Sequence, residues 1–101
     1  MTNIQKYRLD SSEWMGFETE IIKGKRYYTK DKIKIRIQAW QPDISYSQMH
    51  MMIQKLIEEG APVSMTWVYD KWIVSVAYSL IEHENIRTAF RLACTNFKIV
   101  K

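Results

Sequence analysis

The clearest pattern in the chain is a strict alternation of apolar and polar residues from Lys32 to Trp40. One set of alternate positions holds Ile33, Ile35, Ile37 and Ala39, and the other holds Lys32, Lys34, Arg36, Gln38 and Trp40. Successive side chains of a β-strand point to opposite faces of a sheet. The pattern therefore predicts a half-buried strand with a basic outer face. Pro42 should end this strand, because proline has no N–H to donate to a ladder.

Two more strands are predicted before this one. Residues 17–22 have the composition of a strand, and Lys23-Gly24 suits a tight turn. Tyr27 and Tyr28 favour a second strand after the turn, because aromatic residues are enriched in sheets. These segments predict a hairpin that leads into the basic strand.

The first residues have a weaker pattern. Residues 1–10 mix charged and polar side chains, and we expect a flexible arm or a short lead-in. Ser11 and Ser12 are suitable caps for a short helical turn over residues 13–15, which Gly16 would end.

An amphipathic helix is predicted after Pro42. Ser45 and Gln48 have the spacing of a capping box. Gly60 suits the position just past the helix, and Pro62 follows it two residues later. The apolar stripe between these ends consists of Met49, Met52, Ile53, Leu56 and Ile57.

The second half predicts an aromatic hairpin followed by a helix. Residues 63–69 and 72–79 alternate in the manner of strands, with a turn at Asp70-Lys71. A close turn would pair Trp67 or Tyr69 with Trp72 or Val74 across the strands. A final helix should run from about residue 83 or 84 to about residue 96. Its apolar positions are Ile86, Ala89, Phe90, Ala93, Cys94 and Phe97, and Lys98 and Lys101 would lie near its negative end.

This order of elements predicts an α+β fold. We expect a mainly antiparallel sheet of about four to five strands, covered by two main helices in a sandwich. The 101 residues fit a single domain, 1–101, in which 1–10 is the expected arm.

Several short motifs resemble one known family. Met15-Gly16-Phe17 is similar to the Met-Gly-aromatic motif of the phage ABA-sandwich domain family, which consists of small phage and prophage proteins. Trp40-Gln41-Pro42-Asp43 resembles the family's entry into its first long helix. The hairpin around Trp72 and the Ala-rich helix that holds Cys94 resemble its ending, so the similarity covers residues 11–97. In this chain Arg91 precedes Cys94, whereas the family often has the cysteine first.

The resemblance implies an α/β sandwich and a phage origin. It implies no reaction and no functional residues, because the function of the family is generally unassigned.

Charge is concentrated in residues 23–36. Seven basic residues and one acidic residue give this segment a net charge of +6, whereas the whole chain has a net charge of +4. The candidate binding residues are Lys25, Arg26, Tyr28, Lys32, Lys34 and Arg36. They could bind an acidic protein or an anionic ligand. Alternatively, the lysines and arginines only keep a strand edge solvated and prevent it from pairing with other strands.

Other candidate chemistry is sparse. His50 and His83 have no cysteine or carboxylate at the spacing of metal ligands. Cys94 lies on the apolar stripe of the last helix, where a small buried side chain is expected. We therefore predict no metal site, no cofactor and no catalytic residues.

These observations favour a non-enzymatic phage or prophage accessory protein in the host bacterial cytoplasm. It would act by binding, and would inhibit or redirect an acidic host protein. The alternative is nucleic-acid or nucleotide binding through the basic strand region, residues 23–36. No apolar run approaches the ~20 residues of a membrane span, so no membrane partner is expected. A homo-oligomer through a strand edge or a surplus tryptophan is left open.

Overall fold

The computed structural model describes residues 1–97, which form three α-helices, one short 3-10 helix and six strands. In chain order these are α1 (Asn3–Trp14), β1 (Glu18–Ile22), β2 (Lys25–Lys30), β3 (Ile33–Arg36), η1 (Ile37–Ala39), α2 (Tyr46–Glu58), β4 (Val63–Val68), β5 (Lys71–Val76), β6 (Ser79–His83) and α3 (Ile86–Phe97). The predicted roles of Lys98 and Lys101 fall outside the described residues.

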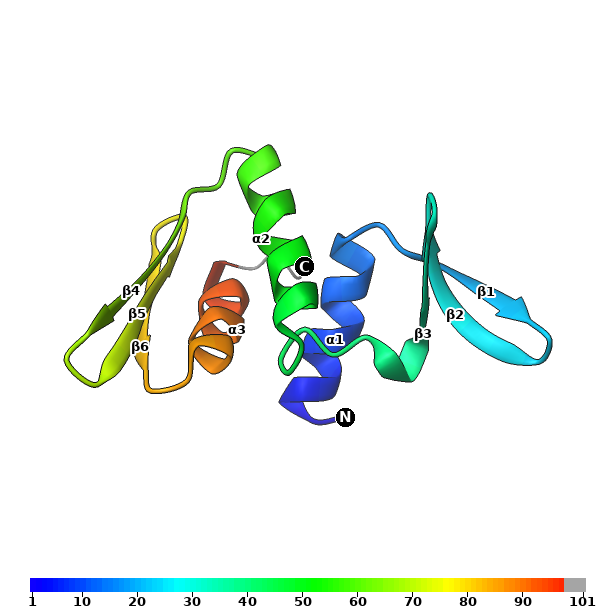
Figure 1. Ribbon diagram of the computed structural model, residues 1–101, viewed down its shortest axis with the longest axis horizontal. Helices are drawn as coiled ribbons and strands as arrows, with labels where there is room; N and C mark the ends of the chain where they lie inside the picture. Colours follow the sequence, from blue (N-terminus) through cyan, green and yellow to red (C-terminus); the bar gives the residue numbers. More distant parts are fainter. Residues whose placement is uncertain (98–101) are drawn as a thin grey trace.

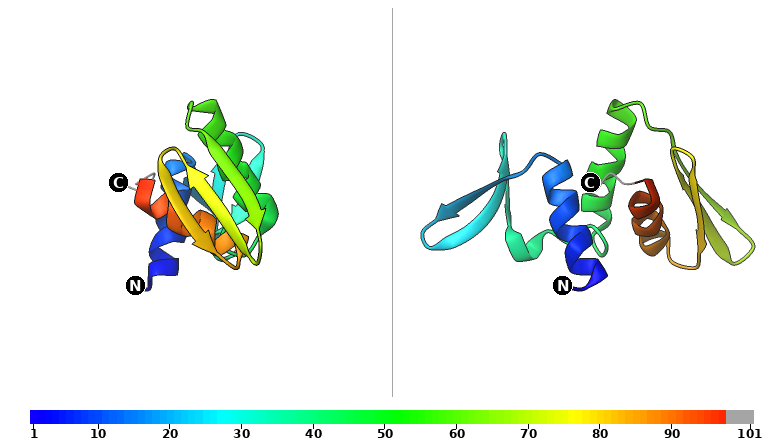
Figure 2. Two further views of the ribbon diagram at one scale, coloured as in Figure 1. Left: turned by 90° about the vertical axis from the view of Figure 1, so that its left-hand side faces the viewer. Right: turned by 180° about the vertical axis from the view of Figure 1, so that it is seen from behind.

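The helices lie between two separate antiparallel sheets (Figure 1). The first sheet has the order β1-β2-β3 and the second has the order β4-β5-β6. Figure 2 shows the same arrangement from the end and from behind. The molecule is elongated, and its principal axes measure 49, 26 and 22 Å. The α+β class and the antiparallel pairing are confirmed.

The number of elements differs from the prediction. The described residues contain six strands in two sheets and three α-helices, instead of one sheet of four to five strands and two helices. Sequence alternation identifies strands and local hairpins. It does not determine whether distant hairpins join into one sheet, since that depends on how the helices pack between them.

The prediction of a flexible arm over residues 1–10 is wrong, because α1 begins at Asn3. Thr2 and Gln5 form a capping box, in which each backbone N–H donates to the side chain of the other residue. Tyr7 and Ser11 are buried, Tyr7 against Met52 of α2 and Ser11 against Trp40. The helix is weakly amphipathic, so tertiary packing of these few residues orders a segment that has little periodic signal of its own.

The basic strand is shorter than predicted. It ends at Arg36, and η1 then turns the chain over residues 37–39. As a result Trp40 does not point outward with the lysines, but lies in the core with 1% of its surface exposed. Its indole Nε1 donates to Ser11 Oγ at 3.0 Å, which satisfies a buried polar group on each side.

The predicted helix after Pro42 is confirmed. Ser45 caps α2 by accepting a hydrogen bond from the Gln48 N–H at 3.3 Å, and Gly60 follows the helix with a φ of +83°. The Gln48 side chain does not complete the predicted capping box. Its amide nitrogen instead donates to the Ala39 carbonyl at 2.9 Å, and its oxygen accepts from the Gln41 N–H, which joins η1 to α2. Met49, Met52 and Leu56 are buried, as predicted.

The aromatic hairpin forms with its turn one residue earlier than predicted, at Tyr69-Asp70. Trp67 and Trp72 pair across β4 and β5, with ring centroids 5.3 Å apart. A third strand, β6, was not predicted, because Ser79–His83 combines polar and apolar residues without a long alternation. Asn85 then caps α3 through its side-chain oxygen, which accepts from the Thr88 N–H at 3.0 Å.

The core joins the three helices to both sheets, and Tyr28 is its buried member from the first sheet. Tyr7, Met52 and Cys94 come from α1, α2 and α3, and the Tyr7 hydroxyl donates to Met52 Sδ at 3.5 Å. Val74 and Val76 of β5 and the α3 residues Ala89, Phe90 and Ala93 are fully buried. The burial of Cys94 is as predicted.

Candidate functional site

The structure divides the six predicted binding residues between two faces and a turn. Side chains alternate along β2, and cross-strand partners share a face of the sheet. Lys25, Lys34 and Arg36 therefore lie on the outer face of the first sheet. Arg26 and Tyr28 belong to its inner face, and Lys32 lies in the β2–β3 turn.

Tyr28 is a packing residue. It has 9% of its surface exposed and stacks on Phe17, with ring centroids 5.9 Å apart. Tyr27 occupies the outer face instead, opposite Glu20 of β1 on one side and Arg36 of β3 on the other. Counting alternate positions along β2 from Lys25 would have identified Tyr27 as the outward residue.

Two acidic residues share the outer face with the cations. Rows across the sheet place Glu18, Thr29 and Lys34 side by side, and Glu20, Tyr27 and Arg36 in the next row. No salt bridge within residues 1–97 includes a lysine or arginine of this face. The outer face is thus a mixed surface with a positive excess, rather than a purely basic ladder.

Lys30 has a structural role that separates it from the other cations of the segment. Its Nζ donates to the Met15 carbonyl at 2.7 Å. Lys55 of α2 donates in the same way to the Trp14 carbonyl and lies over the Trp14 ring. The C-terminal end of a helix has unpaired carbonyls and partial negative charge, so the two ammonium groups stabilise the end of α1.

The remaining six cations of the segment are all exposed. We call them the cationic surface, and they are Lys23, Lys25, Arg26, Lys32, Lys34 and Arg36. They come from the β1–β2 and β2–β3 hairpins, which form one end of the long axis (Figure 1). The two hairpins therefore place the six cations of this segment at one end of the molecule.

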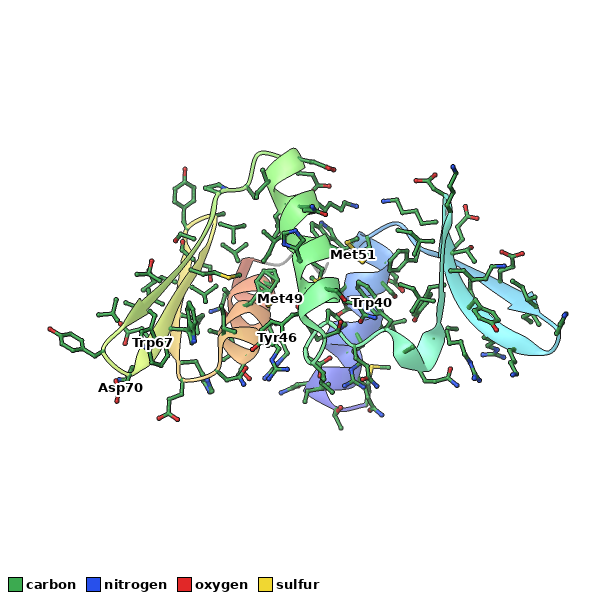
Figure 3. All side chains as sticks on the ribbon, viewed as in Figure 1. Trp40, Tyr46, Met49, Met51, Trp67 and Asp70 are labelled. Atoms are coloured by element: carbon green, nitrogen blue, oxygen red, sulfur yellow. The ribbon has the colours of Figure 1, made fainter. Side chains whose placement is uncertain are left out.

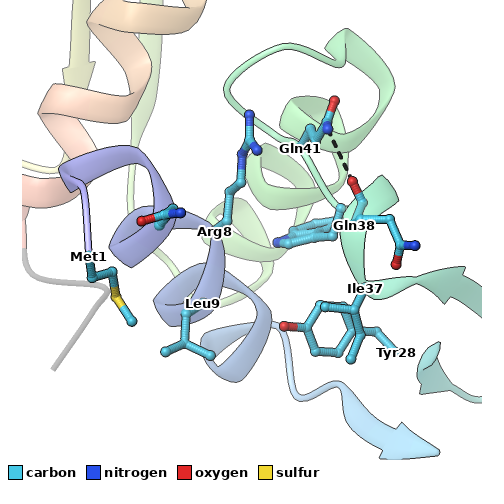
Figure 4. Close-up of a pocket in the computed structure, with 9 residues that line it drawn as sticks. Met1, Arg8, Leu9, Tyr28, Ile37, Gln38 and Gln41 are labelled. Atoms are coloured by element: carbon cyan, nitrogen blue, oxygen red, sulfur yellow. Dashed lines mark hydrogen bonds between the residues drawn. The ribbon is translucent and has the colours of Figure 1, made fainter. Parts of the chain in front are cut away.

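A pocket of about 690 Å³ lies beside the inner face of the first sheet (Figure 4). Its lining combines apolar residues with amide side chains and one arginine, and consists of Met1, Gln5, Arg8, Leu9, Tyr28, Ile37, Gln38, Trp40 and Gln41. Its size and apolar character are typical of small-molecule sites. Sequence patterns could not identify it, because its walls come from α1, β2 and the η1 region together.

The arginine of this pocket is fixed by an ion pair. Arg8 Nε and Nη2 donate to the two carboxylate oxygens of Asp43 at 2.8 and 2.9 Å. Burial of Asp43 tends to raise its pKa, but the hydrogen bonds and charge of Arg8 outweigh burial and lower the pKa below its ordinary value. Arg8 is therefore committed to the structure rather than free to bind an anion.

Other reactive groups are not arranged for chemistry. Burial raises the pKa of the Cys94 thiol far above its ordinary value, so the thiolate does not form at neutral pH. His50 is exposed on α2, and His83 Nδ1 accepts a hydrogen bond from the Asn85 N–H at 3.0 Å. Residues 1–97 contain no group of three histidine, cysteine or carboxylate side chains that could hold a metal ion.

The chain has no match among protein-family models, curated proteins or solved structures. None of the helices in the described part of the chain combines the length and the apolar character needed to cross a bilayer. The similarity to the phage ABA-sandwich domain family therefore stays a prediction, and functional inference depends on the surfaces described above.

Proposed function

We propose that this chain is a non-enzymatic binding protein whose cationic surface binds an acidic partner protein. The observation that carries the proposal is the set of six exposed cations at one end of the molecule, with no salt bridge within residues 1–97 to neutralise them. In line with the motif resemblance, we propose a phage or prophage accessory protein that acts in the host bacterial cytoplasm. It would inhibit or redirect a host protein.

The physical role of the cationic surface would be steering and complementarity. Exposed charges attract an oppositely charged surface over about a Debye length, roughly 8 Å at physiological salt. Such charges raise the association rate and exclude partners of like charge. Tyr27 lies between charged rows on the outer face and offers a contact that is both apolar and polar.

An acidic protein fits this face better than a nucleic acid does. Glu18 and Glu20 lie in the same rows as Lys34 and Arg36, and would repel phosphates that approach the outer face. A protein surface can place its own cations or amides opposite these carboxylates. Binding of a nucleic acid remains the alternative function, through the hairpin cations Lys23, Arg26 and Lys32.

The test compares capture of bacterial proteins by the wild-type chain and by Lys25→Glu/Lys34→Glu/Arg36→Glu. We expect the variant to lose a small set of acidic proteins, and we expect their capture by the wild type to weaken as salt increases. Lys34→Glu and Lys71→Glu form a matched pair, because both reverse one charge on an exposed strand residue at opposite ends of the molecule. Capture that is equally sensitive to both single variants, or to neither, would contradict the assigned surface.

Titration with an oligonucleotide distinguishes the proposed protein binding from the alternative, nucleic-acid binding. A labelled single-stranded oligonucleotide is added to the wild-type chain at about 50 mM salt, where phosphate contacts are strong. If the chain binds an acidic protein as proposed, its affinity for the oligonucleotide is low, and Lys34→Glu changes that affinity little. Tight binding that falls steeply with salt would instead support the nucleic-acid function.

A further inference from the structure

The four free strand edges of the two sheets differ in charge. The edge strands are β1, β3, β4 and β6. β1 carries Glu18 and Glu20, β3 carries Lys34 and Arg36, and β6 carries Glu82. Only β4, with the sequence VSMTWV, lacks any charged residue. Charged residues usually protect an exposed edge from pairing with other chains, so β4 is the unprotected edge among the described strands.

The backbone of β4 presents alternate residues to this open edge. The Ala77 N–H donates to the Pro62 carbonyl at 2.7 Å, which places the peptide groups of even-numbered residues toward β5. Peptide groups alternate along a strand. The N–H and C=O groups of Val63, Met65 and Trp67 therefore point to the free edge, and within residues 1–97 they have no hydrogen-bond partner.

Several side chains along the free edge of β4 are exposed and available for contact with another chain. Ser64 and Thr66 are exposed on the outer face of the second sheet. Trp67 packs against Trp72 but keeps 51% of its surface exposed, and it lies at the hairpin end of β4 (Figure 3). Tryptophan is enriched at interfaces, so an exposed tryptophan beside unpaired backbone groups favours a contact surface.

We propose that β4 pairs in antiparallel fashion with β4 of a second copy of the chain and forms a two-fold dimer. The two-fold axis passes through Met65, so that Met65 faces the partner's Met65. Val63 then faces the partner's Trp67, and Ser64 faces the partner's Thr66. Three pairs of edge-facing residues that each exchange two bonds would give about six backbone hydrogen bonds. The second sheets of the two copies become one continuous sheet.

Charge favours a second copy at β4 over β1 and β3. Self-pairing of β1 over its whole length would place Glu20 opposite its own counterpart. Self-pairing of β3 would place Lys34 opposite a second lysine or Arg36. Like charges directly opposite each other destabilise a strand pair. In β4, Ser64 and Thr66 meet across the interface and can hydrogen-bond instead.

Light scattering after size exclusion, at about 100 μM protein, measures the dimer directly, because self-association depends on concentration. We expect the wild-type chain to be dimeric. Ser64→Lys/Thr66→Lys should raise the dimer dissociation constant roughly tenfold or more, because it places two lysines opposite two others. Both positions are exposed in the single chain, so folding should be retained, which far-ultraviolet circular dichroism checks. A monomeric wild-type chain at this concentration would overturn the proposal.

Charge reversal tests the partner and the register. Ser64→Glu/Thr66→Glu should also be monomeric alone, and mixing it with Ser64→Lys/Thr66→Lys should restore a dimer that contains one copy of each. Leu80→Glu is the matched control, since it adds a charge to an exposed outer-face position on the opposite edge strand, β6, where a β6 pair centred on Ile81 would set it opposite Glu82. A dimer that Leu80→Glu disrupts and the β4 variants do not would assign the interface to β6 and refute β4.

Discussion

Arg8 and Asp43 form a bidentate ion pair that joins α1 to the loop that precedes α2. Two guanidinium nitrogens of Arg8 lie 2.8 and 2.9 Å from the two carboxylate oxygens of Asp43. The Asp43 side chain is 8% exposed and the Arg8 side chain is 29% exposed. Parallel hydrogen bonds of this kind fix orientation as well as charge. The pair therefore holds the wall of the pocket beside Trp40 in one arrangement.

We expect Asp43→Asn to lower the free energy of unfolding by about 2 kcal/mol, because it leaves a partly buried guanidinium without its counter-charge. Urea denaturation measures the change. Asp10→Asn is the control: Asp10 pairs with Lys6, whose side chain is 62% exposed. An exposed pair contributes about 0–1 kcal/mol, so this variant should stay close to the wild type. Equal losses in both variants would contradict the special role of the Arg8 pair.

The Arg8–Asp43 pair also makes the free energy of unfolding depend on pH under acidic conditions. The pKa of Asp43 is lower in the folded chain than in the unfolded chain. The stabilisation that its carboxylate adds to the free energy of unfolding is therefore fully present above the unfolded pKa, about 3.9. The contribution is lost as the pH falls through the folded pKa. Asp43→Asn should therefore lose less stability than the wild type as the pH falls below about 4. Parallel acid curves for the two proteins would refute this.

Local patterns predicted much of the fold. The alternation at Ile33 and Ile35, the Ser45 cap and the Gly60 end are visible in the residues themselves, since each depends on neighbours only a few positions away. The helix over residues 3–14 was missed because it depends on the burial of Tyr7 against residues about 45 and 87 positions later, Met52 and Cys94.

The candidate site could be predicted only in part. A charge count located the cationic segment, and alternation assigned Lys34 and Arg36 to an exposed face, as the structure shows. The count could not reveal that Lys30 stabilises the end of α1, because the carbonyl that it contacts is 15 residues away. The free edge of β4 likewise requires the strand order, which no single segment contains.

Lys30 and Lys32 differ in role although they are two residues apart. We expect Lys30→Gln to lower the free energy of unfolding by about 1 kcal/mol, because a charged hydrogen bond to the Met15 carbonyl is replaced by a weaker one. Lys32→Gln removes the same charge from an exposed turn and should change stability by less than about 0.5 kcal/mol. Thermal or urea unfolding separates the two variants. A larger loss for Lys32→Gln than for Lys30→Gln would show that net charge, and not the helix end, matters.

The β5–β6 turn contains a residue in a conformation that favours glycine. Ala77 has a φ of +55°, in the left-handed region, which costs a residue with a Cβ about 1–2 kcal/mol. Ala77→Gly removes this cost but gives the unfolded chain about 0.4–1 kcal/mol of additional conformational freedom. We expect a net gain in stability of about 0.5 kcal/mol by chemical denaturation. Ala39→Gly, at an exposed position with ordinary negative φ, should instead destabilise the chain, and a gain there would contradict the argument.

Cys94 should make the folded chain sensitive to alkali. Burial raises the pKa of its thiol, so the thiol stays protonated in the folded chain while the unfolded chain ionises above about pH 8.5. The stabilisation from the protonated Cys94 thiol is therefore fully present below that pH. Above it, the free energy of unfolding decreases by up to about 1.4 kcal/mol per pH unit. Burial also raises the pKa of Tyr7, which adds a second loss of stability above about pH 10.

Cys94→Ala should flatten the curve of unfolding free energy against pH between about pH 8.5 and pH 10, although it lowers stability at neutral pH by removing a buried atom. A thiol reagent provides an independent measurement, because its reaction with Cys94 should follow the rate of opening of the core; rapid labelling of the folded chain would show that the thiol is accessible.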